Sequence, residues 1–260
     1  HGTPEPDRLD VTLPAARRFA GDLVDELVRW FPGRWWHAGA DEYLGPFSTD
    51  ADWARHPQLL AYAQRTHGPG ANAKDAVLDF VRFIDDRVRR AGKHLRVWSD
   101  GVGGGATVSL RRGTVVEWWD DIHSQPPAAL VQAGYDVLNA GWWPTYYVTG
   151  GPLTGHRASE QDMFAGWSPW QFDGPRSSRF TGGPGDGFTL PPSSPALTGA
   201  ALNVWNDDPT SPGSAPEAIA TGITPRLRIL AQKTWGTTSP AADAGAFGTL
   251  AGRALGTPGP

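Results

Sequence analysis

Cysteine is absent from the 260 residues of this chain, and its absence excludes three kinds of chemistry. The chain cannot form a disulfide, bind a metal through thiolates or use a cysteine nucleophile. A reduced cytosolic protein and a cysteine-free secreted enzyme look alike in this respect. Of the two compartments, we expect the extracellular one.

Long apolar segments and a strong charge of either sign are also lacking. No apolar run reaches the roughly 20 residues that a membrane-spanning helix needs, and no basic segment followed by an apolar one marks a signal peptide. The formal net charge is −4, which argues against nucleic acid or an anionic membrane as a partner. We therefore expect neither of these partners.

Tryptophan, by contrast, is abundant, with 13 residues in the chain. Its broad apolar face and single N–H suit the C–H face and the hydroxyl rim of a sugar. We expect some of these tryptophans to be structural and others to line a carbohydrate site.

The most informative stretch is 35–43, with the sequence WWHAGADEY. It is predicted to be a short buried strand that ends in two adjacent carboxylates, Asp41 and Glu42. Buried charges are costly unless they are paired or functional. Alternation along a strand places His37 and Asp41 on one face and leaves Glu42 at the strand end. A helix N-cap or a surface acidic pair is the alternative, which the preceding apolar residues disfavour.

Helices and strands alternate along the chain. Apolar spacing and capping residues predict helices at 14–32, 72–92, 128–133 and 217–235. The last of these is expected to begin with a capping box at Ser214 and to be interrupted by Pro225. Strands are predicted at 94–100, 114–120, 136–142 and 200–207. The stretches 45–70 and 150–195 are expected to be loops. This alternation predicts an α/β fold with a parallel sheet, and the length favours a single domain over residues 1–260.

The pattern His-x-Gly-x-Asp-Glu at residues 37–42 resembles that of the β-N-acetylhexosaminidases of glycoside hydrolase family 20. Further landmarks of that family follow in the same order, namely Trp98, Trp119, Tyr146, Trp205 and Asp207. The resemblance covers nearly the whole chain, but only the later part of the family's catalytic domain. It implies a (β/α)8 TIM-type barrel of which only about strands four to eight are present.

A barrel sheet without its first three strands has two unpaired edges and an exposed inner face. We therefore expect the missing strands, with an arginine, an aspartate and a histidine that the family uses, to come from the rest of a parent chain or from another chain. The 260 residues are not expected to be stable alone.

The resemblance also implies a reaction, which is the removal of terminal β-linked N-acetylhexosamine with retention, by an exo-acting enzyme. In this family the acetamido oxygen of the substrate attacks the anomeric carbon and forms an oxazolinium intermediate. Asp41 would orient the acetamido group and stabilise its charge, Glu42 would be the general acid and then the base, and Tyr146 would donate to the acetamido oxygen. Two adjacent carboxylates raise the pKa of one of them, and the sequence does not say which; a raised pKa at Glu42 would help it hold its proton while Asp41 stays ionised. No cofactor or metal is implied.

Several residues match substrate-binding positions of the family. The pocket tryptophans and an acid that binds a sugar hydroxyl correspond to Trp98, Trp119, Trp205 and Asp207. Trp167 is a further candidate, because it lies in a long predicted loop. His37 and Asp41 together are a weak metal signal without further ligands, so we expect His37 to pack beneath the carboxylates and donate a hydrogen bond.

Three alternatives remain open beside this hypothesis. Val148 stands where many family members have an aspartate that contacts a sugar hydroxyl, so a lacto-N-biosidase-like release of a disaccharide is one alternative. A carbohydrate-binding protein without turnover is the second, although Asp41, Glu42 and Tyr146 favour catalysis. The third is an inactive fragment. In each active case the partner is an oligosaccharide or glycoconjugate that contains N-acetylhexosamine.

Overall fold

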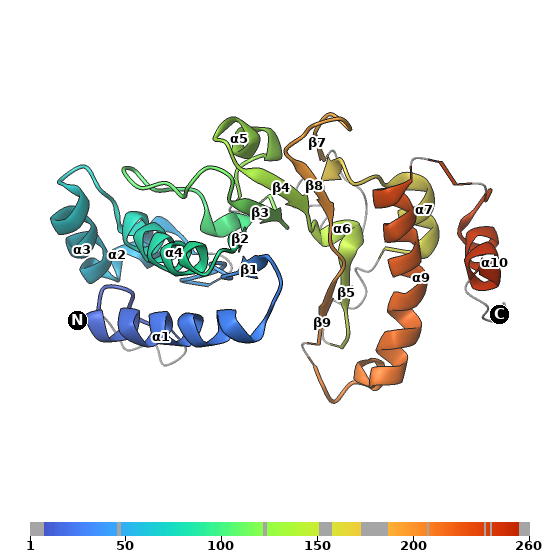
Figure 1. Ribbon diagram of the computed structural model, residues 1–260, viewed down its shortest axis with the longest axis horizontal. Coiled ribbons are helices and arrows are strands. Elements are labelled where there is room, and N and C mark those ends of the chain that lie inside the picture. The colour runs from blue at the N-terminus through green and yellow to red at the C-terminus, as the bar shows by residue number, and fades with distance from the viewer. Residues whose placement is uncertain are drawn as a thin grey trace. The chain divides into compact units, whose positions relative to one another are not determined.

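The computed structural model divides the chain into two compact units (Figure 1). The first consists of His1–Glu117, His123–Gln125 and Leu130–Asp136, and the second of Trp118–Ile122, Pro126–Ala129 and Val137–Pro260. The structure describes residues 8–45, 48–121, 124–150, 158–172, 187–206, 208–236, 238–239 and 241–254. No helix among these residues is long and apolar enough to cross a membrane.

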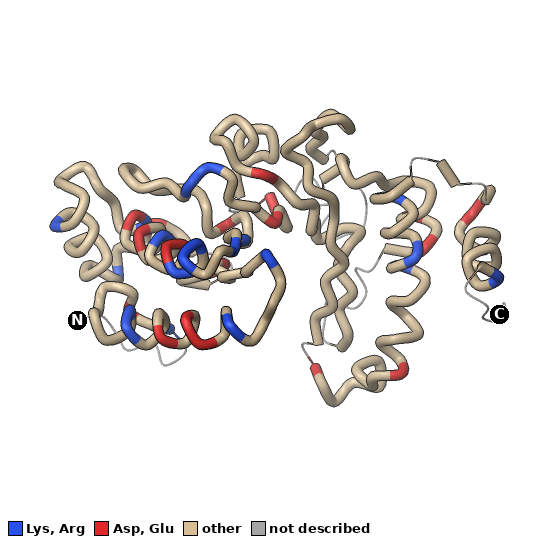
Figure 2. Tube along the Cα trace, viewed as in Figure 1, with Lys and Arg blue, Asp and Glu red and all other residues tan. Residues whose placement is uncertain are grey.

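Two long helices of the first unit confirm the sequence prediction. Helix α1, Pro14–Trp30, begins at a proline, whose missing N–H is not needed in the first turn. Helix α4, Ala73–Arg90, is capped by Asn72, which accepts the N–H of Asp75, while the Asp75 carboxylate accepts the N–H of Asn72. Figure 2 shows acidic and basic residues interspersed along both helices.

Three strands of the first unit pair in parallel, as predicted. They are β1 (Trp35–His37), β2 (His94–Trp98) and β3 (Val115–Trp118). The prediction for the first of them was wrong in one respect, because β1 is only partly buried and ends at His37. Asp41 and Glu42 therefore follow the strand in a loop and do not close it.

The stretch 45–70 is not one long loop. It contains helix α2, Asp50–Ala54, and helix α3, Pro57–His67. Thr49 and Asp52 form a capping box at the start of α2. Helix α3 begins at a proline and buries Leu59 and Ala63, four residues apart, on one face.

The second unit contains three short strand pairs and most of the remaining helices. Strand β4 (Asp136–Asn139) pairs in parallel with β8 (Leu197–Ala200), and β5 (Tyr146–Val148) pairs in parallel with β9 (Asn203–Trp205). The antiparallel pair is β6 (Gln171–Phe172) and β7 (Phe188–Thr189). The predicted strand 200–207 is thus two strands, which separate because each bonds a different neighbour. Asp207 lies outside the described residues.

The other helices are short except for the one that follows β9. They are α5 (Pro127–Gln132), α6 (Trp142–Thr145), α7 (Glu160–Gly166), α9 (Pro216–Trp235), α10 (Ala244–Ala254) and the 3-10 turns η1 (Ser99–Gly101) and η3 (Pro212–Ser214). Helix α7 was missed, because it lies inside the stretch predicted to be a loop.

Helix α9 differs from its prediction at two points. Its N-cap is Ala215, and the hydroxyl of Ser214 donates to the carbonyl of Asp208 and makes no capping box. The helix also continues through Pro225. A proline removes one helical hydrogen bond, and four residues later Ile229 is buried in the core of the second unit.

The described core of the second unit lies where α7, α9 and α10 meet. Its buried members are Trp143, Ala158, Met163, Phe164, Trp167, Ile229 and Phe247. Figure 1 shows α9 running beside β5, and the ring of Tyr147 lies against Gly222 of that helix. Because β5 and β9 pair in parallel, their carboxyl ends lie on the same side.

Candidate active site

The loop that carries the two acids has an unusual backbone. Gly39, Ala40 and Glu42 have positive φ angles of 69°, 74° and 45°. For residues other than glycine this left-handed region costs about 1–2 kcal/mol each. Such conformations persist only where neighbouring groups enforce them, and they are frequent at functional sites.

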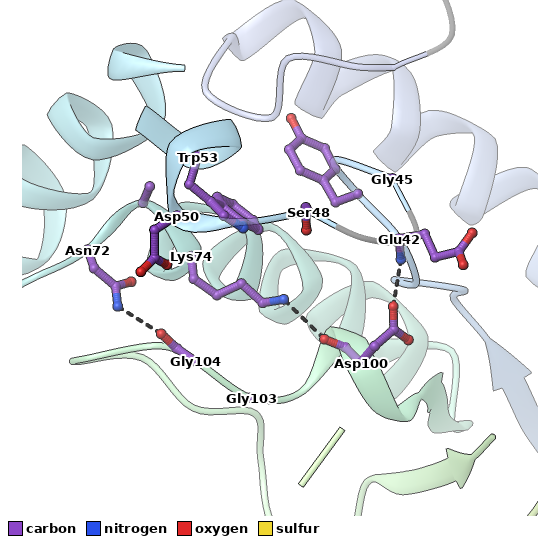
Figure 3. Close-up of a pocket in the computed structure, with 12 residues that line it drawn as sticks. Glu42, Gly45, Ser48, Asp50, Trp53, Asn72, Lys74, Asp100, Gly103 and Gly104 are labelled. Atoms are coloured by element: carbon purple, nitrogen blue, oxygen red, sulfur yellow. Dashed lines mark hydrogen bonds between the residues drawn. The ribbon is translucent and has the colours of Figure 1, made fainter. Parts of the chain in front are cut away.

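The carboxyl end of β2 supplies the groups that fix this loop. The Ala38 N–H donates to the Arg96 carbonyl at 2.9 Å, and the Trp98 N–H donates to the Gly39 carbonyl at 3.0 Å. The Glu42 N–H donates to Oδ2 of Asp100 at 2.7 Å, as Figure 3 shows. Both ends of the loop are therefore bonded to one neighbouring segment.

Asp41 and Glu42 both reach solvent, although the surrounding protein also encloses part of Asp41. Desolvation raises the pKa of the Asp41 carboxyl, a hydrogen bond from its own backbone N–H opposes the rise, and the negative charge of Asp100 adds to it. The sequence left open which of the two acids has a raised pKa, and at Asp41 the pKa is raised. In Figure 3 the Glu42 side chain extends away from Asp100 and Lys74.

His37 accepts a hydrogen bond through Nδ1, and its Nε2, 3.4 Å from Glu117 Oε1, makes no hydrogen bond with the described residues, so the donated bond that we expected is not formed among them. Its Nδ1 accepts the N–H of Gly39 at 3.0 Å, and its ring lies 4.8 Å from that of Trp98, centroid to centroid. Burial lowers the pKa of His37 to about 4, and the Arg96 charge contributes. The imidazole is therefore neutral at pH 7, which suits an acceptor.

Next to His37 lies an ion pair of the partly exposed Arg96 and the buried Glu117. Arg96 Nη2 is 2.5 Å from Oε1 of Glu117, and the same oxygen is 3.4 Å from His37 Nε2. Burial raises the pKa of Glu117, and Arg96 opposes that rise. No group of three or more histidine, aspartate or glutamate side chains among the described residues could hold a metal ion.

A cluster of aromatic rings surrounds Tyr146 in the second unit. Trp119 stacks on it at 6.5 Å and an interplanar angle of 13°, and Trp205 lies at 5.6 Å. These three residues were predicted to share a site, and the structure brings them together. Trp142, at 5.0 Å, was missed. No local signal pointed to it, because the segment between Trp142 and Tyr146 is kinked and has no regular spacing.

Tyr147 faces different surroundings from those of Tyr146, as alternation predicted. The Arg226 guanidinium lies over its ring, 5.3 Å from the ring centroid, and the ring lies against Gly222 of α9. Tyr146 is therefore the tyrosine that belongs to the aromatic cluster.

Trp167 lies in the core of the second unit. It is 2% exposed, and its indole N–H donates to the Gln171 carbonyl at 3.0 Å. An indole with so little surface is placed for packing rather than for contact with a sugar.

A cavity of about 290 Å³ in the first unit lies beside Glu42 and was not foreseen (Figure 3). The Lys74 ammonium donates to the Asp100 carbonyl at 3.0 Å and lies 5.3 Å from the Trp53 ring. Burial lowers the pKa of Lys74, and Asp100 opposes this. The sequence placed Asp100 at a strand end but gave it no role, because its partner is 58 residues away.

The sequence pattern of the glycosyl hydrolase family 20 catalytic domain matches residues 1–238. The chain belongs to this family. It is 30% identical over 246 residues to a lacto-N-biosidase of Bifidobacterium bifidum, covering 92% of this chain and 20% of that protein. It is also 30% identical over 132 residues to a β-N-acetylhexosaminidase of Cellulomonas fimi, covering 50% of this chain and 21% of that protein. The family 20 chain thus spans about a fifth of the length of these curated relatives.

Solved structures of family 20 enzymes share its fold. A β-N-acetylhexosaminidase from Bacteroides fragilis matches with a TM-score of 0.68 at 19% identity, covering 94% of this chain and 45% of that one. An exo-β-N-acetylglucosaminidase from Vibrio harveyi, in complex with N-acetylglucosamine, matches with a TM-score of 0.67 at 19% identity. The match covers 95% of this chain and 35% of that one. The predicted fold class, part of an α/β barrel of the TIM type, is confirmed.

Proposed function

We propose that this family 20 chain carries the acid pair of a retaining exo-glycosidase that removes terminal β-linked N-acetylhexosamine. The observation that carries the proposal is the loop after β1, which holds two adjacent, exposed carboxylates on a backbone with three positive φ angles. A loop that only connected β1 to α2 would have no need of this strain. The family membership supports the same reaction.

The proposed reaction uses the acetamido group of the substrate as the nucleophile. Its carbonyl oxygen bonds to the anomeric carbon as the glycosidic C–O bond breaks, and Glu42 gives its proton to the leaving oxygen. Asp41 accepts the acetamido N–H and stabilises the positive charge of the oxazolinium. Glu42 then takes a proton from water, which opens the ring at the anomeric carbon and restores both the acetamido group and the acid.

The remaining residues keep the roles that the family resemblance implies. Tyr146 would donate its hydroxyl hydrogen to the acetamido oxygen, and Trp98, Trp119 and Trp205 would wall the pocket. The proposed partner is an oligosaccharide or glycoconjugate with N-acetylhexosamine at its end. We also propose that the protein is secreted, as we expected from the sequence.

The direct test is the Glu42→Gln variant of the full-length protein with an aryl N-acetylglucosaminide. Loss of general acid and base catalysis should lower kcat about 10²- to 10⁴-fold. Glu26→Gln is a matched control, since Glu26 is exposed on α1 and should leave kcat unchanged. Unchanged turnover in Glu42→Gln would contradict the proposed acid, and sugar binding with no turnover in the wild type would favour a binding protein.

A second candidate is the release of a disaccharide, as the name of the Bifidobacterium bifidum relative states for that protein. The identity of 30% over 92% of the chain favours it, and Val148, which is buried in β5, offers no acid to a sugar hydroxyl. Two aryl glycosides separate the two candidate reactions. One is the aryl glycoside of N-acetylglucosamine, and the other is that of a disaccharide whose N-acetylglucosamine bears the aryl group. Turnover of the disaccharide substrate alone would select this candidate.

A further inference from the structure

We propose that Asp100 is a positioning residue for the reaction, which holds Glu42 in the backbone conformation from which its carboxyl reaches the substrate. This inference rests on the proposed function of Glu42. Asp100 is 5% exposed in the turn η1, directly after β2. Its Oδ2 accepts the Glu42 N–H at 2.7 Å, a hydrogen bond across 58 residues of sequence.

The Glu42 backbone needs such a partner. Its φ of 45° is in the left-handed region, which a residue with a side chain seldom adopts without help. The hydrogen bond holds the Glu42 N–H toward η1, and with the N–H held, the φ angle about the N–Cα bond sets where the Glu42 side chain and the following backbone lie. Bonds between an N–H and a carboxylate are among the stronger hydrogen bonds in proteins, so Asp100 is suited to hold the strained conformation.

The direction of the Glu42 side chain follows from this conformation. Figure 3 shows the side chain leaving the loop on the side away from Asp100 and Lys74. Asp100 therefore bonds the main chain of Glu42 and leaves its carboxyl to other partners. A residue that acts in this way changes the position of the acid without touching the substrate.

Asp100 is itself fixed from several directions. Its carbonyl accepts the Lys74 ammonium at 3.0 Å, and Lys74 lies in the first turn of α4, behind the Asn72 cap. The next residue, Gly101, lies so close to the Ala40 carbonyl that a Cβ there would overlap it. On the other side, the Ser99 hydroxyl accepts a hydrogen bond from the Ser124 hydroxyl at 2.6 Å. The acceptor is thus rigid before any substrate binds, as an effective positioning group should be.

The test compares Asp100→Ala with Asp100→Asn in the full-length protein. Asparagine keeps a side-chain oxygen that can accept the Glu42 N–H, whereas alanine does not. We expect Asp100→Ala to lower kcat about 10- to 100-fold through misplacement of the acid, with KM changed by less than about threefold. Asp100→Asn should recover most of this loss. Asp50→Ala removes another acid that lines the same cavity and should leave kcat unchanged.

Amide hydrogen exchange gives a readout that does not depend on turnover. The Glu42 amide should be protected in the wild type and in Asp100→Asn, and should exchange faster in Asp100→Ala. If the wild type shows this protection but no turnover, the proposed function fails and the positioning of Glu42 stands. Equal kcat losses in the two Asp100 variants, a loss confined to KM, or unchanged protection in Asp100→Ala would each overturn the inference.

Discussion

Acidification should destabilise the first unit through His37. In the folded chain burial lowers the pKa of this imidazole from 6.5 to about 4, so between these values the unfolded chain binds a proton that the folded chain does not. The free energy of unfolding should therefore fall as the pH drops from 6.5 to about 4 and level off below. At 1.36 kcal/mol for each pKa unit, the full loss is about 3 kcal/mol. The side chain is 28% exposed, so solvent screening reduces this only in part.

The neighbouring Glu117 acts in the opposite direction. Burial raises its pKa, so on acidification the folded chain takes up a proton at this carboxyl before the unfolded chain does, which stabilises it. The contribution of His37 must therefore be isolated by a variant. In His37→Asn the side-chain oxygen can lie near the place of Nδ1 and accept the Gly39 N–H, but the side chain does not titrate.

Urea unfolding of both proteins at about pH 7 and about pH 4.5 measures the difference. The wild type should lose about 2 to 3 kcal/mol more than His37→Asn over this range. An NMR titration of the imidazole should give a midpoint near 4. Equal pH dependence of the two proteins, or a midpoint near 6.5, would refute the argument that His37 is buried as a neutral acceptor.

Three further predictions concern other residues. Gly101→Ala should cost about 1–3 kcal/mol of stability, because its Cβ would overlap the Ala40 carbonyl, whereas Gly103→Ala, which meets only a flexible side chain, should be nearly neutral in the same urea titration. A thiazoline mimic of the intermediate should bind at least about 100-fold more tightly than N-acetylglucosamine by calorimetry, and Asp41→Asn should abolish most of this gain; equal affinities would contradict substrate assistance. Trp167→Ala should lower stability by about 3–5 kcal/mol with KM unchanged, and a raised KM at unchanged stability would restore its role in binding.

Much of the fold could be predicted because its signals are local. The capping box at Asn72 and the apolar face behind it fix α4, and the proline at its start fixes α1. The same kind of signal was present at Thr49 and Pro57. The residues around them show no regular apolar spacing, so α2 and α3 were not predicted. Residues that look irregular in sequence can thus still hold short helices.

The acid loop could not be predicted in the same way. An unbroken alternating pattern through residue 41 indicated a strand, whereas the chain leaves the strand at His37 and turns left-handed at Gly39 and Ala40. Ala40 and Glu42 adopt this conformation because of groups far along the chain, among them the Asp100 carboxylate. No local property of the sequence carries that information.

The aromatic residues show both outcomes. Trp119, Tyr146 and Trp205 were matched by the order of family landmarks, and the structure gathers them. Trp167 was placed in a loop by composition, but α7 and α9 bury it. Abundance of tryptophan indicated a carbohydrate site without saying which indoles belong to it.

The rings around Tyr146 also bear on the entropy of binding. Contacts with three indoles leave the phenol ring little freedom to rotate about χ1 and χ2, so the direction of its hydroxyl is set by the protein itself. A side chain that is immobilised on binding typically costs about 0.5–1.5 kcal/mol. Here that loss of freedom is incurred during folding, so a ligand that bonded this hydroxyl, as proposed, would keep more of the free energy of the contact.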